Sequence, residues 1–323
     1  MATKRLLMVA AILMLANLVE TRQGLPLLAQ DQVGAVIEQV RTALGGDRLA
    51  AVKTLSAEGP FRRSMGQRDM EGTIVLTLQR PDRIRRAEEM GMGGMVGGPT
   101  VERISGFDGT VAWDDIQNRG GMGGGMRMMI RGPGDGPGGG PGGGMLTPEQ
   151  IEQQRVRRMR NELQRWTVAL FADSARPFNY AGVAESPDGK ADILETTDEA
   201  DRPVRLFVSQ ASHLPLMVQY MEVRPRVMVQ GGPGGPGGPG RRGGGPPPSR
   251  EEMEQRIEEM RKQGPPPPSA FSMHLGEYRT VDGVQLPHRV TLSVEGQPTE
   301  EWTIEKYRVN PNVKASEFEK PKS

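Results

Sequence analysis

Apolar and polar side chains alternate with a period of two near the end of the chain, from Phe271 to Val309. Val290 and Leu292 fall on one face of this segment, and Thr291 falls on the other. Turns that contain Gly or Pro separate three such stretches. Because successive side chains of a strand point to opposite faces, the alternation predicts a three-stranded antiparallel meander with one buried and one solvated face. We expect it to form the closing edge of a larger sheet.

The same alternation recurs upstream, from 54 to 113 and from 178 to 220. Asp108-Gly109, between two short apolar stretches, is typical of a tight hairpin turn. The charged segment from Arg83 to Glu89 is predicted to be an edge strand or a strand that faces solvent. Together these segments predict a mainly β, antiparallel domain.

Two segments carry the period of about 3.6 residues that is typical of an amphipathic helix. The first runs from Asp31, a candidate N-cap, to Leu44. The second begins at Thr147 and is expected to end near Phe171. Its start, Thr-Pro-Glu-Gln, predicts a capping box. The arginines in its first half are more typical of a solvated helix face than of a binding site.

Two blocks, 119–145 and 230–268, consist largely of Gly and Pro. Such segments cannot bury enough apolar surface to offset the entropy of ordering them, so they are predicted to be disordered inserts. We therefore expect a single domain over 30–323 that these two blocks interrupt.

The N-terminus has the order of a secretory signal peptide: Lys4 and Arg5, then an apolar run, then Leu27-Leu28-Ala29 as a cleavage region. A helix over the apolar run would be about 21 Å long, short of a hydrocarbon core of about 30 Å. Residues 1–29 are therefore predicted to be a signal peptide without stable transmembrane insertion. The mature protein is expected in the periplasm.

Composition and spacing argue against most catalytic classes. The net charge of +1 gives no bulk attraction to nucleic acid, and the absence of Cys excludes thiolate sites and disulfides. Asp114 and Asp115 are adjacent on a predicted strand and therefore point to opposite faces. His213 and His288 stand beside Leu-Pro strand starts, where turn or edge positions are expected, and no nucleophile motif is present. We expect a protein that is not an enzyme and needs no cofactor.

Methionines suggest an alternative, because thioethers are soft ligands that suit Cu(I). The candidate ligands in the first Gly-rich block are Met122, Met126, Met128 and Met129. Together with Met90, Met92, Met95 and Met145, they are expected in two mobile loops. Another alternative is an adaptor that meets an acidic partner through Arg241-Arg242 and the basic half of the second helix.

Three stretches carry a family resemblance: FDGTVAW (107–113), VRLFVSQASHLPLMVQY (204–220) and YRTVDGVQLPHRVTLSVEGQPTEEWTIEKYRVN (278–310). Their strand and turn motifs resemble the LolA/LolB-like periplasmic carriers that sort outer-membrane lipoproteins. The resemblance implies an α+β, mainly β fold. In this fold a curved antiparallel sheet forms an unclosed half-barrel, and a few helices cover its concave face.

The resemblance also implies an apolar cavity that carries the acyl chains of lipid or lipoprotein cargo, with envelope transport proteins as further partners. Each CH2 group removed from water contributes about 0.8 kcal/mol, so a chain of ~16 carbons represents on the order of 13 kcal/mol. An enclosed cavity can provide this stabilisation. The candidate lining residues are Ile74, Leu76, Trp113, Leu206, Val208, Val218, Val290 and Trp302. The alternative is that these side chains only pack beneath the helices.

Overall fold

The computed structural model describes residues 26–65, 68–91, 100–119, 147–186, 189–223 and 267–321. The chain divides into two compact units, one of residues 1–122, 156–221 and 270–323 and one of residues 123–155 and 222–269. The sheet belongs to the first unit. Most of the predicted signal peptide and nearly all of both Gly/Pro-rich blocks lie outside the described residues. The predicted domain boundaries therefore stay a prediction.

The described residues form thirteen strands in one mainly antiparallel sheet. The first five are β1 (Thr54–Met65), β2 (Arg68–Gln79), β3 (Arg83–Gly91), β4 (Thr100–Phe107) and β5 (Ala112–Arg119). The next four are β6 (Asn179–Ser186), β7 (Gly189–Thr197), β8 (Pro203–Ser209) and β9 (Pro215–Val223). The last four are β10 (Pro268–Val281), β11 (Val284–Val294), β12 (Gln297–Thr303) and β13 (Lys306–Val309).

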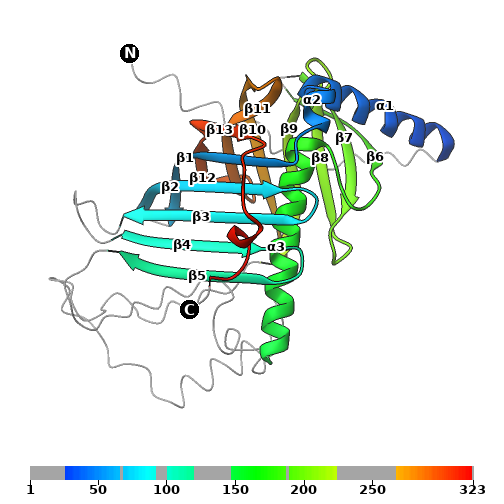
Figure 1. Ribbon diagram of the computed structural model, residues 1–323. Helices are drawn as coiled ribbons and strands as arrows, with labels where there is room; N and C mark the ends of the chain where they lie inside the picture. The colour runs from blue at the N-terminus through cyan, green and yellow to red at the C-terminus, as the bar shows by residue number, and fades with distance from the viewer. Residues whose placement is uncertain are drawn as a thin grey trace. The chain divides into compact units, whose positions relative to one another are not determined.

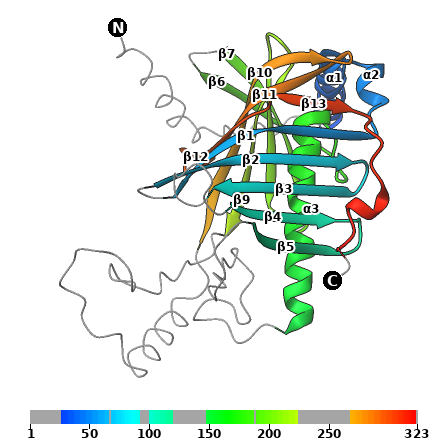
Figure 2. The ribbon, with the colours of Figure 1, turned by 60° about the vertical axis from the view of Figure 1, so that its left-hand side comes forward.

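The strand order is β5-β4-β3-β2-β1-β12-β11-β10-β9-β8-β7-β6, and β13 pairs with β1 beside this path. Among the described strands, β5 and β6 are therefore the two ends of an open sheet. Figures 1 and 2 show β1 to β5 running across the direction of β6 to β9, with β10 to β12 between the two groups. The predicted mainly β, open and curved antiparallel fold is confirmed.

The meander that was expected at the edge lies in the middle of the sheet. Strand β12 pairs with β1, with Phe61 opposite Trp302, and β10 neighbours β9. At Gly59 the partner of β1 changes from β12 to β13, and a Cβ atom there would run into the carbonyl oxygen of Thr303. The prediction of an edge was wrong because alternation reports which face a residue occupies, not which distant strand lies beside it.

Strand β3 also differs from its prediction. It lies between β2 and β4, with Ile84 opposite Leu78 and Phe107, so it is an interior strand. Two of its charged residues, Arg86 and Glu88, point to the same face as the buried Ile84. The prediction failed because buried charges become tolerable when each has an opposite charge beside it, and most of those partners come from other strands or from a helix.

The helices are α1 (Pro26–Leu44), α2 (Asp47–Ala50), α3 (Pro148–Phe171) and the 3-10 turn η1 (Ala315–Glu317). The capping box of α3 is confirmed: the Thr147 N–H donates to Gln150 Oε1 at 2.9 Å, and the Gln150 N–H donates to Thr147 Oγ1 at 3.3 Å. Helix α1 begins at Pro26, so Asp31 lies inside it and is not its N-cap. No helix in the described part of the chain is both long and apolar enough to cross a membrane.

The apolar stripe of α3 covers one face of the sheet, called here the inner face. Met159, Leu163, Trp166 and Leu170 of α3 belong to the same buried cluster as Leu76 of β2. The opposite, outer face of β1 to β5 is crossed by residues 310–321, called here the C-terminal strap (Figure 1). Its Phe318 is fully buried, and its carbonyl oxygen accepts a 2.6 Å hydrogen bond from the Trp113 indole.

Candidate functional site

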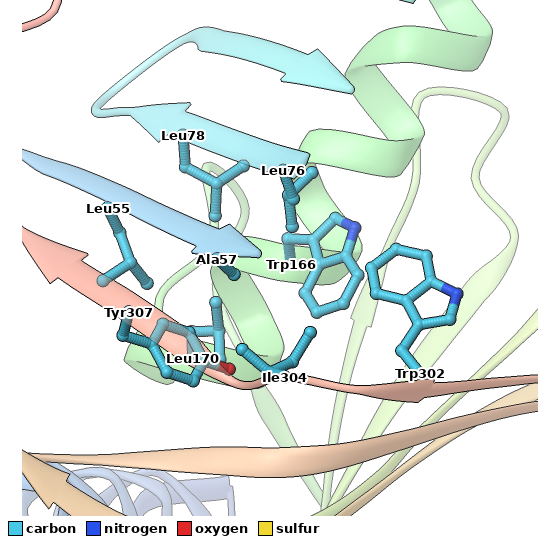
Figure 3. Close-up of a pocket in the computed structure, with 9 residues that line it drawn as sticks. All are labelled: Leu55, Ala57, Leu76, Leu78, Trp166, Leu170, Trp302, Ile304 and Tyr307. Carbon is cyan, nitrogen blue, oxygen red and sulfur yellow. The ribbon is translucent and has the colours of Figure 1, made fainter. Parts of the chain in front are cut away.

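A small cavity lies between α3 and the inner face, where Trp166 meets Trp302 (Figure 3). Its lining side chains are apolar or aromatic: Leu55, Ala57, Leu76, Leu78, Trp166, Leu170, Trp302, Ile304 and Tyr307. They come from α3, from the neighbouring strands β1, β2, β12 and β13, and from the β12–β13 link. The centre of a water molecule could occupy a volume of about 10 Å³ inside the cavity, so the cavity has room for roughly one water.

All eight predicted cavity residues are buried, but they do not form one group. Leu76 and Trp302 line the cavity. The members that pack in the same inner cluster without lining the cavity are Ile74, Leu206, Val208, Val218 and Val290. Trp113 lies on the outer face: its neighbour Ala112 belongs to the inner cluster, adjacent strand residues point to opposite faces, and its indole is bonded to the strap. No signal within β5 could have shown that the strap covers this tryptophan.

Trp302 marks the boundary between an apolar and a charged part of the inner face. Its ring stacks on Trp166 of α3, with a centroid distance of 5.2 Å. Its indole N–H donates to Glu300 Oε1 at 2.5 Å, and the guanidinium of Arg86 lies 4.9 Å from its ring centre. The same side chain therefore contacts the cavity on one side and charged groups on the other.

Eight charged side chains continue the inner face beyond Trp302, and we call them the ion network. They are Arg63, Arg86, Glu88, Arg103, Asp114, Arg158, Glu162 and Glu300. They come from β1, β3, β4, β5, β12 and α3. With four arginines and four carboxylates, the network is neutral in sum.

The first part of the network centres on two glutamates. Arg63 donates to Glu88 at 2.9 Å and to Glu300 at 2.8 Å. Arg86 pairs with Glu88 and Glu300, and it donates to Glu162 of α3 at 3.2 Å. Each arginine thus joins strands that are not neighbours in the sequence. Burial alone would raise the pKa of Glu88, but Arg86 and Arg63 outweigh it and lower this pKa to about 2.

The second part centres on Asp114 of β5. Arg158 of α3 donates to Asp114 Oδ2 at 2.5 Å, and Arg103 of β4 lies 3.8 Å from Asp114 Oδ1. The expectation that the arginines of this helix only face solvent is therefore wrong for Arg158. Its acidic partner belongs to this chain, whereas Arg241 and Arg242, the other half of the adaptor prediction, lie outside the described residues.

Sequence reasoning missed the ion network as a unit. The available signal was that Arg86 and Glu88 are two residues apart on a strand, so they share a face with the apolar Ile84. The partners could not be found in the same way, because Arg63 and Glu300 stand 237 positions apart.

The metal alternatives have a mixed outcome. Met122, Met126, Met128 and Met129 lie outside the described residues, so their role stays a prediction. Met90 was expected in a loop, but it is buried in β3 with its sulfur 4.0 Å from Arg63 Nη1. Across the described ranges, no three His, Asp or Glu side chains are arranged to hold a metal ion.

The histidines occupy different settings. His213 has a positive φ of 56° in the turn before β9, as expected of a turn residue. His288, by contrast, is buried inside β11, where its Nδ1 lies 2.7 Å from the Ile304 carbonyl oxygen. The expectation of a turn or edge position was wrong for His288 because β11 is an interior strand.

No protein-family model matches the sequence, and no curated protein matches it. The similar solved structures include a DUF1329 family protein from Desulfovibrio piger at 10% identity, an outer membrane lipoprotein-sorting protein domain from Vibrio parahaemolyticus at 8%, and a LolA superfamily protein from Nitrosomonas europaea at 9%. Each matches with a TM-score of 0.42 over 88% or 89% of this chain and 97% of the other chain.

These identities and TM-scores are too low to carry a function over, so the function depends on the side chains of this chain. The likeness to these structures concerns the fold alone.

Proposed function

We propose that the protein is an exported, non-enzymatic carrier that shields the acyl chain of a lipid or lipoprotein between α3 and the inner face. The observation that supports it most is the cavity at Trp166 and Trp302, which is enclosed by apolar and aromatic side chains of a helix and a sheet. Export rests on the charged, apolar and small-residue order of residues 1–29.

The cavity has to grow before an acyl chain can enter it. Its volume suits about one water molecule, whereas a cavity of about 150 Å³ is needed even for a benzene-sized ligand. The strands are fixed by their ladders, so the movable wall is α3. The predicted lining residues Ile74, Leu206, Val208, Val218 and Val290 adjoin the cavity in the same cluster, and we propose that they contact the chain once α3 has moved.

The three tryptophans allow a direct test. Trp113→Phe removes the outer-face indole and leaves the stacked pair at the cavity as the only fluorophore of this kind. We expect dibromostearate to quench the emission of this variant on binding, because bromine quenches an indole that it touches. Stearate without bromine measures the change in emission that the movement of α3 causes by itself, so the bromine effect is the further loss of intensity seen with dibromostearate.

The matched control is the double variant Trp166→Phe, Trp302→Phe, which retains Trp113 beneath the strap. Its emission should not respond to dibromostearate. Equal quenching in both variants would show non-specific adsorption, and absence of quenching in both would contradict the carrier proposal. Native mass spectrometry of the protein purified from the periplasm would then identify any acylated cargo.

A further inference from the structure

The surface that α3 covers changes from charged to apolar along the helix. Arg158 and Glu162 contact the ion network, whereas Trp166 and Leu170 line the cavity. At 1.5 Å per residue, Arg158 and Leu170 are about 18 Å apart along the helix axis. A molecule lying beneath α3 would therefore meet a polar region at one end and an apolar region at the other. This is the polarity of an amphiphile.

Within the ion network, Arg63, Arg103 and Arg158 are closer to solvent than Glu88, Asp114 and Glu300. The side chains of Glu88 and Asp114 are each 5% exposed, and that of Glu300 is 9% exposed. Those of Arg63, Arg103 and Arg158 are 23%, 25% and 28% exposed. These three carboxylates thus form a buried layer beneath three guanidinium groups that are partly exposed.

Packing of this part of the core does not require buried ion pairs. A buried group of ion pairs is often no more stabilising than apolar side chains of similar volume, and the cavity end of the same face is built from such side chains. Arg86 Nε is buried and has no hydrogen-bond acceptor among the described residues, so one donor of the network has no partner there. Guanidinium groups fit the oxygen atoms of phosphate, to which they donate two parallel hydrogen bonds.

We infer that the cargo is an amphiphile with a phosphate headgroup, and that Arg103 and Arg158 bind this phosphate while its acyl chain lies at Trp166 and Trp302. Asp114 is a positioning residue, because it contacts both arginines. Arg63, held in the same way by Glu88, adds a third guanidinium to this region of the inner face. This inference rests on the proposed carrier function and adds the chemical class and the orientation of the cargo.

The test compares three probes on the unmodified protein by calorimetry: oleoyl lysophosphatidic acid, monooleoylglycerol and inorganic phosphate. The first two have the same acyl chain and differ in the phosphate. We expect lysophosphatidic acid to bind at least about tenfold more tightly, the effect of one hydrogen bond to a charged group. Arg158→Gln should abolish this preference.

Arg289→Gln is the matched control. Arg289 also lies near two carboxylates, Glu277 at 3.2 Å and Glu301 at 3.5 Å. Its side chain is half exposed and points to the face of β11 opposite the buried Val290. Arg289→Gln removes the same charge and should leave the preference for lysophosphatidic acid intact.

If Arg158→Gln does not fold, Arg158→Lys keeps the charge that Asp114 requires and removes the paired donors. Arg158→Lys should reduce the preference for lysophosphatidic acid. The comparison of the three probes on the unmodified protein needs no variant.

The outcomes separate the two proposals. Equal affinity for lysophosphatidic acid and monooleoylglycerol would overturn the headgroup inference and leave the carrier function standing. No binding of either acyl compound would overturn both. Binding of inorganic phosphate alone, lost in Arg158→Gln, would assign the arginines to a free anion and would also overturn the inference of an amphiphile.

Discussion

At the scale of single residues, Glu88 shows how a charge becomes part of a core. It is 4% exposed, it lies on an interior strand, and two arginines of the inner face contact it. The sign of its effect on stability follows from its pKa, which falls from an ordinary value of 4.5 to about 2 on folding. A carboxylate with a lowered pKa stabilises the folded state fully above its unfolded pKa, and this contribution is lost as the pH falls toward the folded pKa.

Glu88→Gln is therefore expected to lower the free energy of unfolding near neutral pH by about 3 kcal/mol, since it leaves Arg63 and Arg86 buried with less negative charge. It should also reduce the loss of stability between about pH 4.5 and pH 2, so that the variant and the unmodified protein converge there. Urea unfolding at a series of pH values measures both effects. Glu71→Gln is the control, because the Glu71 side chain is 72% exposed and pairs only at the surface with Arg62. An unchanged pH profile in Glu88→Gln would show that the ion pairs of Glu88 contribute nothing to folding.

At the scale of elements, the C-terminal strap covers part of the sheet that no described helix covers. Trp113 lies across Gly106 of β4, where a Cβ atom would run into its indole ring. The indole then donates to the carbonyl oxygen of Phe318, and the phenyl ring of Phe318 is fully buried. Gly106, Trp113 and the strap thus form one packing unit on the outer face.

Phe318→Ala is expected to lower the free energy of unfolding by about 3–5 kcal/mol, because it removes a buried aromatic side chain and leaves a cavity. Trp113 should become exposed to water, which shifts its emission to longer wavelength. This shift is best followed in the variant that lacks Trp166 and Trp302. Glu319→Ala, an exposed position next to Phe318, should change neither quantity. A stable Phe318→Ala protein with unshifted Trp113 emission would show that the strap is not required for this packing.

At the scale of the whole first unit, the sheet is the fixed part, and α3 is the part that the proposed carrier function requires to move. The strands are joined by continuous ladders from β5 to β6. Helix α3 is joined to the sheet by side-chain contacts, such as Arg86 with Glu162, Arg158 with Asp114, and Trp166 with Trp302. The cavity between them is too small for an acyl chain as it stands.

Loading with stearate is therefore expected to increase amide hydrogen exchange in the C-terminal half of α3, because the helix must separate from β1, β2 and β12 to admit the chain. Exchange in β1, β2 and β11 should stay slow, because their ladders remain intact. Mass spectrometry of peptides from the free and the loaded protein measures the difference. Faster exchange in the strands with an unchanged α3 would place the opening elsewhere.

The sequence by itself determined the local features. Alternation with a period of two located nearly all strands and placed Ile74 and Leu76 on the buried face, because the direction of a strand side chain depends only on its position along the strand. The capping box located the start of α3, because its hydrogen bonds join residues three positions apart. The family resemblance supplied the open, curved sheet.

Only the tertiary structure decided what depends on distant pairs. The pairing of β1 with β12 moved the last meander from the edge to the centre of the sheet, and it brought Arg63 to Glu300 across 237 positions. The strap covers Trp113 on the outer face, and α3 brought Trp166 onto Trp302. Periodicity could not determine these contacts, because it fixes the face on which a side chain lies but not the segment that covers that face.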